Sequence, residues 1–137
     1  MKATGRLALD TNAVIAYREG IFEVCTYIDK ADIILLPVTV IGELLYGAFH
    51  STKSKSNEKF VHKFVSYSIV LPIDESVAAR YARVRFDLKK RGNPIPENDI
   101  WIAAACLNLE VPLLSQDNHF NQVPGLSVIS WENTVGN

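Results

Sequence analysis

The sequence predicts an α/β fold, a three-layer α/β/α sandwich with a mostly parallel central sheet. Short strand-like runs alternate with longer segments of helical periodicity, which is the order expected of a sheet covered by helices. The strand-like runs are almost wholly apolar, as strands buried on both faces should be. The chain has 137 residues, enough for one domain, predicted over 1–137, with its own core.

The first half of the chain contains two predicted strands and four predicted helical segments. Thr11 and Asn12 are candidate N-caps for the first helix, because each side chain can accept a hydrogen bond from the helix backbone. Apolar residues recur at helical spacing in the later segments. The strands are Leu7–Leu9 and Ile33–Leu36, and the helical segments are Ala13–Tyr17, Phe22–Lys30, Val38–Phe49 and Asn57–Ser68.

The second half continues the alternation. A helix capped by Asp74 or Ser76 is expected to run to about Arg91 and to stop at Gly92. Pro96 suits the first turn of the next helix. The strands are Ile69–Ile73, Val111–Ser115 and Leu126–Ser130, the second helix is 97–109, and 117–120 is a turn or a short helix.

Composition excludes several classes of protein. Hydrophobic residues make up 48% and charged residues 21%, which is typical of a folded globular chain. No apolar run approaches the roughly 18 residues of a membrane span, and Asp10 interrupts the only early one, so we expect no membrane segment, no signal peptide and a cytoplasmic protein. Cys25 and Cys106 form no CxxC pair, which favours buried free thiols over a zinc site.

The net charge is −1, so the chain is not broadly basic. Basic residues are nevertheless concentrated in two runs, Lys53–Lys63 and Arg80–Arg91. Such runs suit a surface that binds a polyanion beside an acidic pocket. The alternative, that both are ordinary solvated helix faces, stays open at this point.

Four acidic residues carry the functional prediction. Asp10 and Asp117 each follow a predicted strand, Glu43 stands among apolar residues of a helix, and Asp99 opens a helix. The carboxyl ends of parallel strands line the ligand crevice of an α/β fold. Carboxylates crowded there would repel each other unless a divalent cation neutralised them, which indicates a hard-metal site used for phosphate chemistry. Taken singly, each acid also has a plainer interpretation, as a helix cap or a solvated helix position.

Neighbouring polar residues are candidates for supporting these carboxylates. Thr11, Asn12 and Ser115 are placed to orient an acidic ligand, although Thr11 and Asn12 could simply cap and Ser115 could be a plain hydroxyl at a strand end. Glu97 lies two residues before Asp99, which makes it a candidate auxiliary ligand. No histidine is expected to be well placed as a general base; His119, near Asp117, could touch substrate, but it is predicted to lie on a surface turn.

The order of these acids resembles the PIN-domain family of metal-dependent nucleases, most closely the VapC-type toxins of toxin–antitoxin pairs. The resemblance covers nearly the whole chain, and four motifs in order carry it. They are Leu9-Asp10-Thr11-Asn12, Ile41-Gly42-Glu43-Leu44-Leu45-Tyr46-Gly47, Ile95-Pro96-Glu97-Asn98-Asp99-Ile100-Trp101, and Leu114-Ser115-Gln116-Asp117-Asn118-His119-Phe120 with Val123-Pro124-Gly125.

This resemblance implies an endoribonuclease that hydrolyses RNA with Mg²⁺ or Mn²⁺. The catalytic and metal-binding quartet of the family falls on Asp10, Glu43, Asp99 and Asp117, of which the last occupies a position that varies in the family. The resemblance further implies a homodimer and inhibition by a cognate antitoxin. Six apolar residues of the early helices are candidate contact area for partners, with the alternative that most of them belong to the core: Ile15, Tyr17, Phe22, Leu44, Leu45 and Phe49.

Other interpretations share parts of this pattern. A PIN-domain nuclease of RNA processing, or an idle PIN fold that only binds a partner, would have the same architecture. A phospho-acceptor receiver domain needs two early acids and a late lysine, which are not found here. A haloacid-dehalogenase-like phosphatase needs an aspartate at the position of Asn12.

Overall fold

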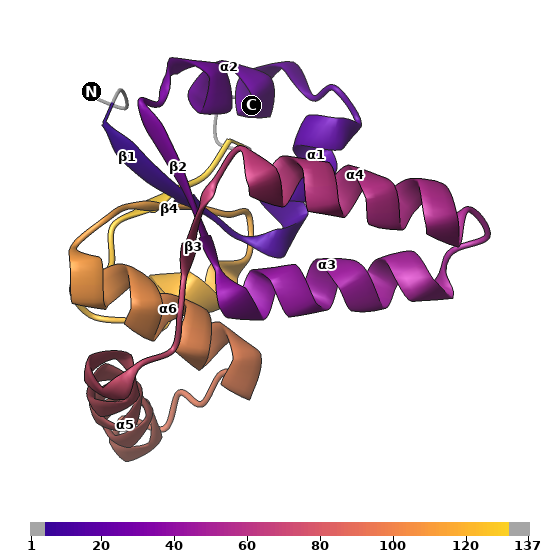
Figure 1. Ribbon diagram of the computed structural model, residues 1–137. Helices are drawn as coiled ribbons and strands as arrows, with labels where there is room; N and C mark the ends of the chain where they lie inside the picture. Colours follow the sequence, from indigo (N-terminus) through magenta and orange to yellow (C-terminus); the bar gives the residue numbers. More distant parts are fainter. Residues whose placement is uncertain (1–4, 132–137) are drawn as a thin grey trace.

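A parallel sheet of five strands forms the centre of the molecule (Figure 1). The strand order is β3-β2-β1-β4-β5, and every neighbouring pair is parallel. This computed structural model describes residues 5–131, and the predicted α/β class with helices around a parallel sheet is confirmed. The strands are β1 (Arg6–Leu9), β2 (Ile33–Pro37), β3 (Ile69–Leu71), β4 (Leu113–Leu114) and β5 (Val128–Ile129).

Helices cover the sheet on both sides. Figure 1 shows α1, α2 and α4 on one side of the strands and α5 and α6 on the other, while α3 continues from the end of β2. This division follows from right-handed crossovers, because the chain moves along the sheet in one direction from β1 to β3 and then returns to β4. The helices are α1 (Thr11–Arg18), α2 (Phe22–Lys30), α3 (Val38–His50), α4 (Ser54–Ser66), α5 (Glu75–Lys90) and α6 (Glu97–Leu109), with the 3₁₀ helix η1 (Asn118–Gln122).

The core lies around β1 and α6. Leu7, Ala8 and Leu9 are at most 1% exposed, as expected of a central strand covered on both faces. Helix α6 buries residues on nearly every side after its first turn, including Ile102 and Cys106 at 0% exposure. A helix that is apolar all round belongs in the interior, so α6 holds its N-terminal turn rigidly against the sheet.

Several element boundaries differ from the sequence predictions. The first helix begins at Thr11 and is capped by Asp10, so the cap predicted at Thr11 or Asn12 is wrong, and the alternative interpretation of Asp10 as a helix cap is confirmed. Helix α4 begins at Ser54, three residues before its predicted start. The prediction that Asp74 caps α5 is confirmed, since its side chain accepts a hydrogen bond from the Val77 backbone N–H.

The last two strands are shorter than predicted. Strand β4 contains only Leu113 and Leu114, and β5 only Val128 and Ile129. Pro112 has no backbone N–H and cannot donate to a neighbouring strand, which limits β4 at its start. Hydrogen bonding continues just beyond β4, where the Ser115 backbone N–H donates to the Ile129 carbonyl at 3.0 Å.

The described residues contain no membrane-spanning candidate, because no helix within 5–131 is both long and apolar enough to cross a bilayer. Both cysteines are free thiols, as predicted, but only Cys106 is buried, while Cys25 is partly exposed. Cys106 is fully buried in α6, and burial raises the pKa of its thiol to about 12. Such a thiol stays protonated and packs as a small apolar side chain.

Candidate active site

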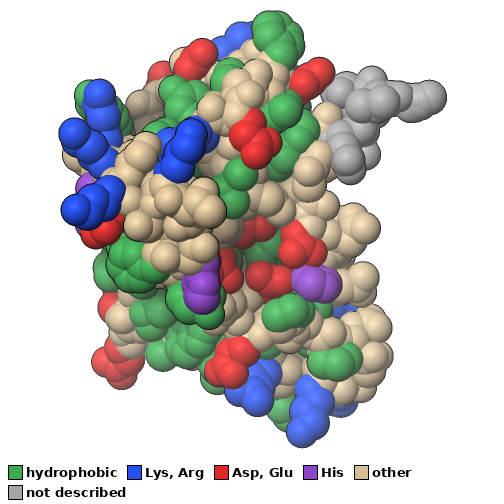
Figure 2. Space-filling view, turned by 90° about the vertical axis from the view of Figure 1, so that its right-hand side faces the viewer, with side chains coloured by type: hydrophobic (Ala, Val, Ile, Leu, Met, Phe, Trp, Pro, Cys, Tyr) green, Lys and Arg blue, Asp and Glu red, His purple; other side chains and the backbone are tan. Residues whose placement is uncertain are grey.

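The four predicted acids line one cleft of about 430 Å³. The cleft opens where β1 and β4 end, the point at which the strand order reverses and at which ligands bind in open α/β sheets. Figure 2 shows Asp and Glu side chains gathered in a hollow near the middle of one face, with histidine side chains beside it. The cleft is lined by Asp10, Thr11, Asn12, Ile15, Glu43, Tyr46, Asn98, Asp99 and Asp117.

Asp10 is the most deeply buried of the four acids, at 5% exposure. One carboxylate oxygen accepts a hydrogen bond from the Thr11 backbone N–H at 2.8 Å, and the other accepts one from the Ser115 hydroxyl at 2.7 Å. These two bonds favour the ionised form, but burial outweighs them and raises the pKa of Asp10 to about 6. The nearby Asp99 and Glu43 carboxylates raise it further, so the site has an excess of negative charge.

Glu43 points from the middle of α3 toward the ends of two other helices. Its carboxylate accepts a hydrogen bond from the Thr11 hydroxyl of α1 at 2.5 Å and one from the Asn98 amide of α6 at 3.1 Å. The side chain is half-buried, which explains why an acid stands among apolar neighbours in the sequence. The two bonds fix the carboxylate at the wall of the cleft.

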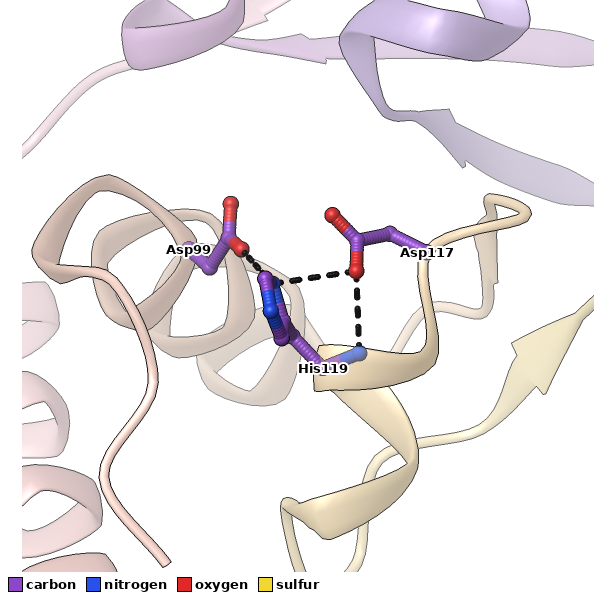
Figure 3. Close-up of side chains that lie close together, drawn as sticks. All are labelled: Asp99, Asp117 and His119. Carbon is purple, nitrogen blue, oxygen red and sulfur yellow. Dashed lines mark hydrogen bonds and ion pairs between the residues drawn. The ribbon is translucent and has the colours of Figure 1, made fainter.

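Asp99, Asp117 and His119 form the other wall (Figure 3). The His119 Nδ1 atom lies 2.8 Å from an Asp99 carboxylate oxygen and 3.0 Å from an Asp117 carboxylate oxygen. Burial raises the pKa of Asp99, and the hydrogen bond with His119 opposes this increase. The same hydrogen bond raises the pKa of His119 above its ordinary value, since it favours the imidazolium.

The structure separates the predicted auxiliary residues. Thr11 and Ser115 contact the acids directly, as described above. Asn12 lines the cleft, and its side-chain Oδ1 is buried without a hydrogen-bond partner among the described residues. Glu97 lies away from the cleft: its carboxylate accepts a hydrogen bond from the Tyr81 hydroxyl at 2.6 Å and its side chain is 60% exposed.

Three residues of the site were not predicted from the sequence. His119 is exposed, as predicted for a surface turn, but its ring also lies between two of the acids, a contact that the sequence did not predict. Its position two residues after Asp117 was the available signal. Asn98, next to Asp99, holds Glu43, and Tyr46, one turn after Glu43, lies 67% exposed at the cleft. Neither residue type suggests such a role by itself.

The donor set fits a divalent cation. Four carboxylates line one space, and Asn12, whose buried Oδ1 has no hydrogen-bond partner within residues 5–131, lines it too. Mg²⁺ and Mn²⁺ prefer such oxygen donors. Burial, with a smaller effect of the Asp99 and Glu43 charges, raises the pKa of Asp10, and a bound cation would offset both effects. Asp99, Asp117 and His119 offer ligand atoms within 4.8 Å of one another.

A groove of about 540 Å³ extends from the cleft between α1, α3 and α4. Thr11 and Glu43 belong to both the cleft and the groove, so the two are continuous. Among the apolar residues expected at a partner surface, Ile15, Phe22 and Phe49 are exposed, and Leu44 is buried. The lysines of the Lys53–Lys63 run are exposed at the start of α4 and along it, but none of them lines the groove, whose basic lining residue is Arg18.

Comparison with known proteins identifies the fold. The family model described as the PIN domain matches residues 7–126, which includes all four acids of the cleft. The chain belongs to the PIN-domain family. Relatives include Ribonuclease VapC5 of Mycobacterium tuberculosis, 29% identical over 126 residues that cover 88% of this chain and 90% of the relative. Ribonuclease VapC1 of Haemophilus influenzae is 27% identical over 128 residues, covering 90% and 96%.

Solved structures of similar fold come from toxin–antitoxin complexes. VapBC-1 from nontypeable Haemophilus influenzae matches with a TM-score of 0.84 and 25% identity over 93% of this PIN domain and 98% of the other chain. VapBC2 from Rickettsia felis, bound to a DNA fragment from its promoter, has a TM-score of 0.84 at 23% identity over 92% and 98%. At that identity the second match is evidence of the fold alone.

Proposed function

We propose that this PIN domain, acting as one domain over 1–137, is a metal-dependent endoribonuclease and the cytoplasmic toxin of a toxin–antitoxin pair. The convergence of Asp10, Glu43, Asp99 and Asp117 in one cleft carries the proposal. Relatives named as ribonucleases of the VapC type give the substrate class. Hydrolysis of an RNA phosphodiester bond is the reaction that fits both the four carboxylates of the cleft and the ribonuclease relatives.

In this proposal Asp10, Glu43 and Asp99 hold Mg²⁺ or Mn²⁺, and Asp117 supports a second ion or a water. Such an ion lowers the pKa of a bound water and stabilises negative charge on the phosphate. Thr11 and Ser115 keep the Asp10 carboxylate in one orientation through the two bonds that it accepts. The fixed carboxylates reduce the reorganisation that binding of an ion would otherwise require.

An RNA strand is a polyanion, and the acidic cleft alone would repel it. Arg18 lines the groove that joins the cleft, and α4, which forms one side of that groove, carries exposed lysines; these basic groups would attract the phosphate backbone. Two alternatives remain distinct from the toxin. A nuclease of RNA processing would use the same site on another RNA, and an idle partner-binding PIN fold would have no need of an intact acid quartet.

The test is cleavage of a panel of total RNA and tRNA by the purified, partner-free protein. Reactions with Mg²⁺ or Mn²⁺ are compared with reactions in EDTA and with Asp99→Asn. Asp29→Asn is the matched control, because Asp29 is an exposed carboxylate on α2 outside the cleft. We expect discrete products from the wild type and the control, and none in EDTA or from Asp99→Asn. Equal cleavage by Asp99→Asn would contradict the proposal.

The antitoxin is expected to cover the cleft and the adjoining groove. Exposed Ile15, Tyr46 and Phe49 would supply apolar contact area there. Growth arrest on expression of the chain, relieved by the product of a small neighbouring gene, would support a toxin and disfavour an RNA-processing role. Light scattering of the free chain and of that complex tests the expected homodimer.

A further inference from the structure

His119 is carried by a short, well-anchored segment. The Asp117 side chain accepts a hydrogen bond from the His119 backbone N–H at 3.0 Å, which caps η1. The next residue, Phe120, is fully buried and ties η1 to the core. The Asp117 backbone N–H donates to the Ser115 hydroxyl at 3.0 Å, so the same segment is also attached to the residue that orients Asp10. The His119 ring is therefore held at the cleft by the backbone around it.

The His119 ring is in direct contact with two of the four acids. Figure 3 shows Asp99 from α6, Asp117 from the segment after β4, and His119 from η1 pointing toward one another. Adjacent ligand atoms around a six-coordinate ion with bonds of about 2.1 Å lie about 3 Å apart. The His119 Nδ1 atom pairs with both carboxylates, at 2.8 Å from Asp99 and 3.0 Å from Asp117, and the same spacing would let the three ligand atoms surround one ion.

The chemistry of the donor then points to the kind of ion. Mg²⁺ binds oxygen ligands and is seldom held by imidazole, whereas Mn²⁺ and the later divalent metals accept imidazole nitrogen. A site that offers only carboxylate oxygens would have no nitrogen donor with which to favour Mn²⁺ over Mg²⁺. With His119 beside Asp99 and Asp117, one wall of the cleft offers a nitrogen donor in addition to its oxygens.

We propose that His119 Nδ1 is a direct metal ligand and that it makes the site prefer Mn²⁺ over Mg²⁺. This inference rests on the proposed function, because it concerns the same cleft. It assigns to His119 a role that the four acids do not require. The competing interpretation is that His119 only pairs with Asp99 and Asp117 while no metal is bound and leaves when an ion enters.

The test uses Mn²⁺ alone as the probe and does not depend on RNA. Mn²⁺ binding is titrated by the loss of the free-ion electron paramagnetic resonance signal. Electron spin-echo modulation of the bound ion, with protein labelled by ¹⁵N at histidine, detects a nitrogen ligand directly. His119→Ala is compared with the wild type, and His62→Gln is the matched control, because His62 is exposed on α4 and contacts only Glu58 among the described residues.

We expect histidine nitrogen coupling in the wild type and in His62→Gln, and none in His119→Ala. Loss of the ligand should weaken Mn²⁺ binding by about tenfold or more, and Mg²⁺ binding by a smaller factor. Bound Mn²⁺ without histidine coupling in the wild type, or an equal loss for both ions in His119→Ala, would overturn the inference. If such a protein still cleaves RNA in a metal-dependent way, the proposed function stands alone. If the wild type binds no Mn²⁺ and cleaves nothing, both fail.

Discussion

Asp10 has two roles that pull its charge in opposite directions. It caps α1 through the Thr11 backbone N–H, which favours a carboxylate, and it is buried at 5% exposure, which disfavours one. Burial dominates and the pKa rises from 3.8 to about 6. The residue therefore destabilises the free protein at neutral pH while being ready to bind a cation.

This conflict predicts a stabilising substitution. A carboxyl whose folded pKa lies above its unfolded pKa stabilises the fold below about pH 4 and loses that contribution as pH rises through about 6. The loss amounts to about 3 kcal/mol at pH 7. Asp10→Asn removes it, so we expect a higher free energy of unfolding than the wild type at pH 7.5 in EDTA, and little gain at pH 4. Urea denaturation at both pH values measures this, and a gain of equal size at both would contradict it.

Ser115 is the second residue on which the site depends. It is 1% exposed, donates to Asp10 and accepts from the Asp117 backbone N–H. Ser115→Ala leaves an acceptor and a donor without their partner, which should cost about 1–3 kcal/mol of stability. It should also weaken metal binding, because Asp10 and Asp117 lose their shared support. Calorimetric unfolding and metal titration test this.

The control for Ser115→Ala is Ser56→Ala, an exposed serine of α4. This change should alter neither unfolding nor metal binding. If both serine variants behave alike, the buried hydroxyl has no special role.

The site residues that lie in a family motif could be predicted from the sequence. The positions of residues that depend on the direction of a side chain could not. Glu97 and Asp99 are two residues apart on α6, and such residues do not face the same way on a helix. That geometry sends Glu97 toward Tyr81 and Asp99 into the cleft. His119 depends on the course of η1, which the sequence offered only as a turn or a short helix.

At the scale of elements, the helices were predicted better than the strands. Phe22–Lys30 and Glu97–Leu109 have the bounds expected from periodicity. Strands β4 and β5 pair over only two residues each, because pairing depends on a neighbour that is far away in the sequence. Apolar residues just outside the paired part of these strands, such as Val111, are buried without belonging to a strand.

Helix α3 contains two glycines that its own packing does not explain. A Cβ atom added to Gly42 or to Gly47 would meet nothing within 4 Å. Glycine within a helix costs about 1 kcal/mol relative to alanine, so each should be replaceable with a gain in stability. Gly47 differs from Gly42 because it lines the groove beside the cleft.

We therefore expect Gly42→Ala and Gly47→Ala to raise the free energy of unfolding alike, by about 0.5–1 kcal/mol each. Only Gly47→Ala should weaken binding of a ligand that enters the groove, whether RNA or antitoxin. Denaturation and binding measured on the same two variants separate these effects. Equal binding by both variants would show that nothing approaches the backbone of α3 at Gly47.

At the scale of the whole molecule, the sheet order explains why residues from five segments meet. β1 lies between β2 and β4, so the loops after β1 and β4 leave the sheet on either side of one crevice. The sequence predicted acids at both strand ends and an alternating fold. It did not determine the strand order, which follows from long-range pairing; the family resemblance supplied the grouping of the four acids, not the order of the strands.

Metal binding should change the stability of the entire fold. An ion that binds only the folded state at about 100 times its dissociation constant adds about 2.7 kcal/mol, or roughly 9 °C in Tm for a chain of this size. We expect this increase with Mn²⁺ at pH 7.5 for the wild type and for Asp29→Asn. It should be lost in Asp99→Asn. Calorimetry in Mn²⁺ and in EDTA measures the difference.

The same increase should depend on pH with a definite sign. Asp10 has a pKa of about 6, and the pKa values of Asp99 and His119 are also raised, so protons compete with the ion as pH falls through this range. Between pH 7.5 and pH 5 the metal-induced increase in Tm should shrink, while the contribution of Asp10 to the metal-free stability grows. Both trends reduce the difference between Tm in EDTA and Tm in Mn²⁺, so the two values should converge toward low pH. A metal-induced increase that stays constant over this range would mean that the ion binds away from the buried carboxylate, and would remove Asp10 from the proposed ligand set.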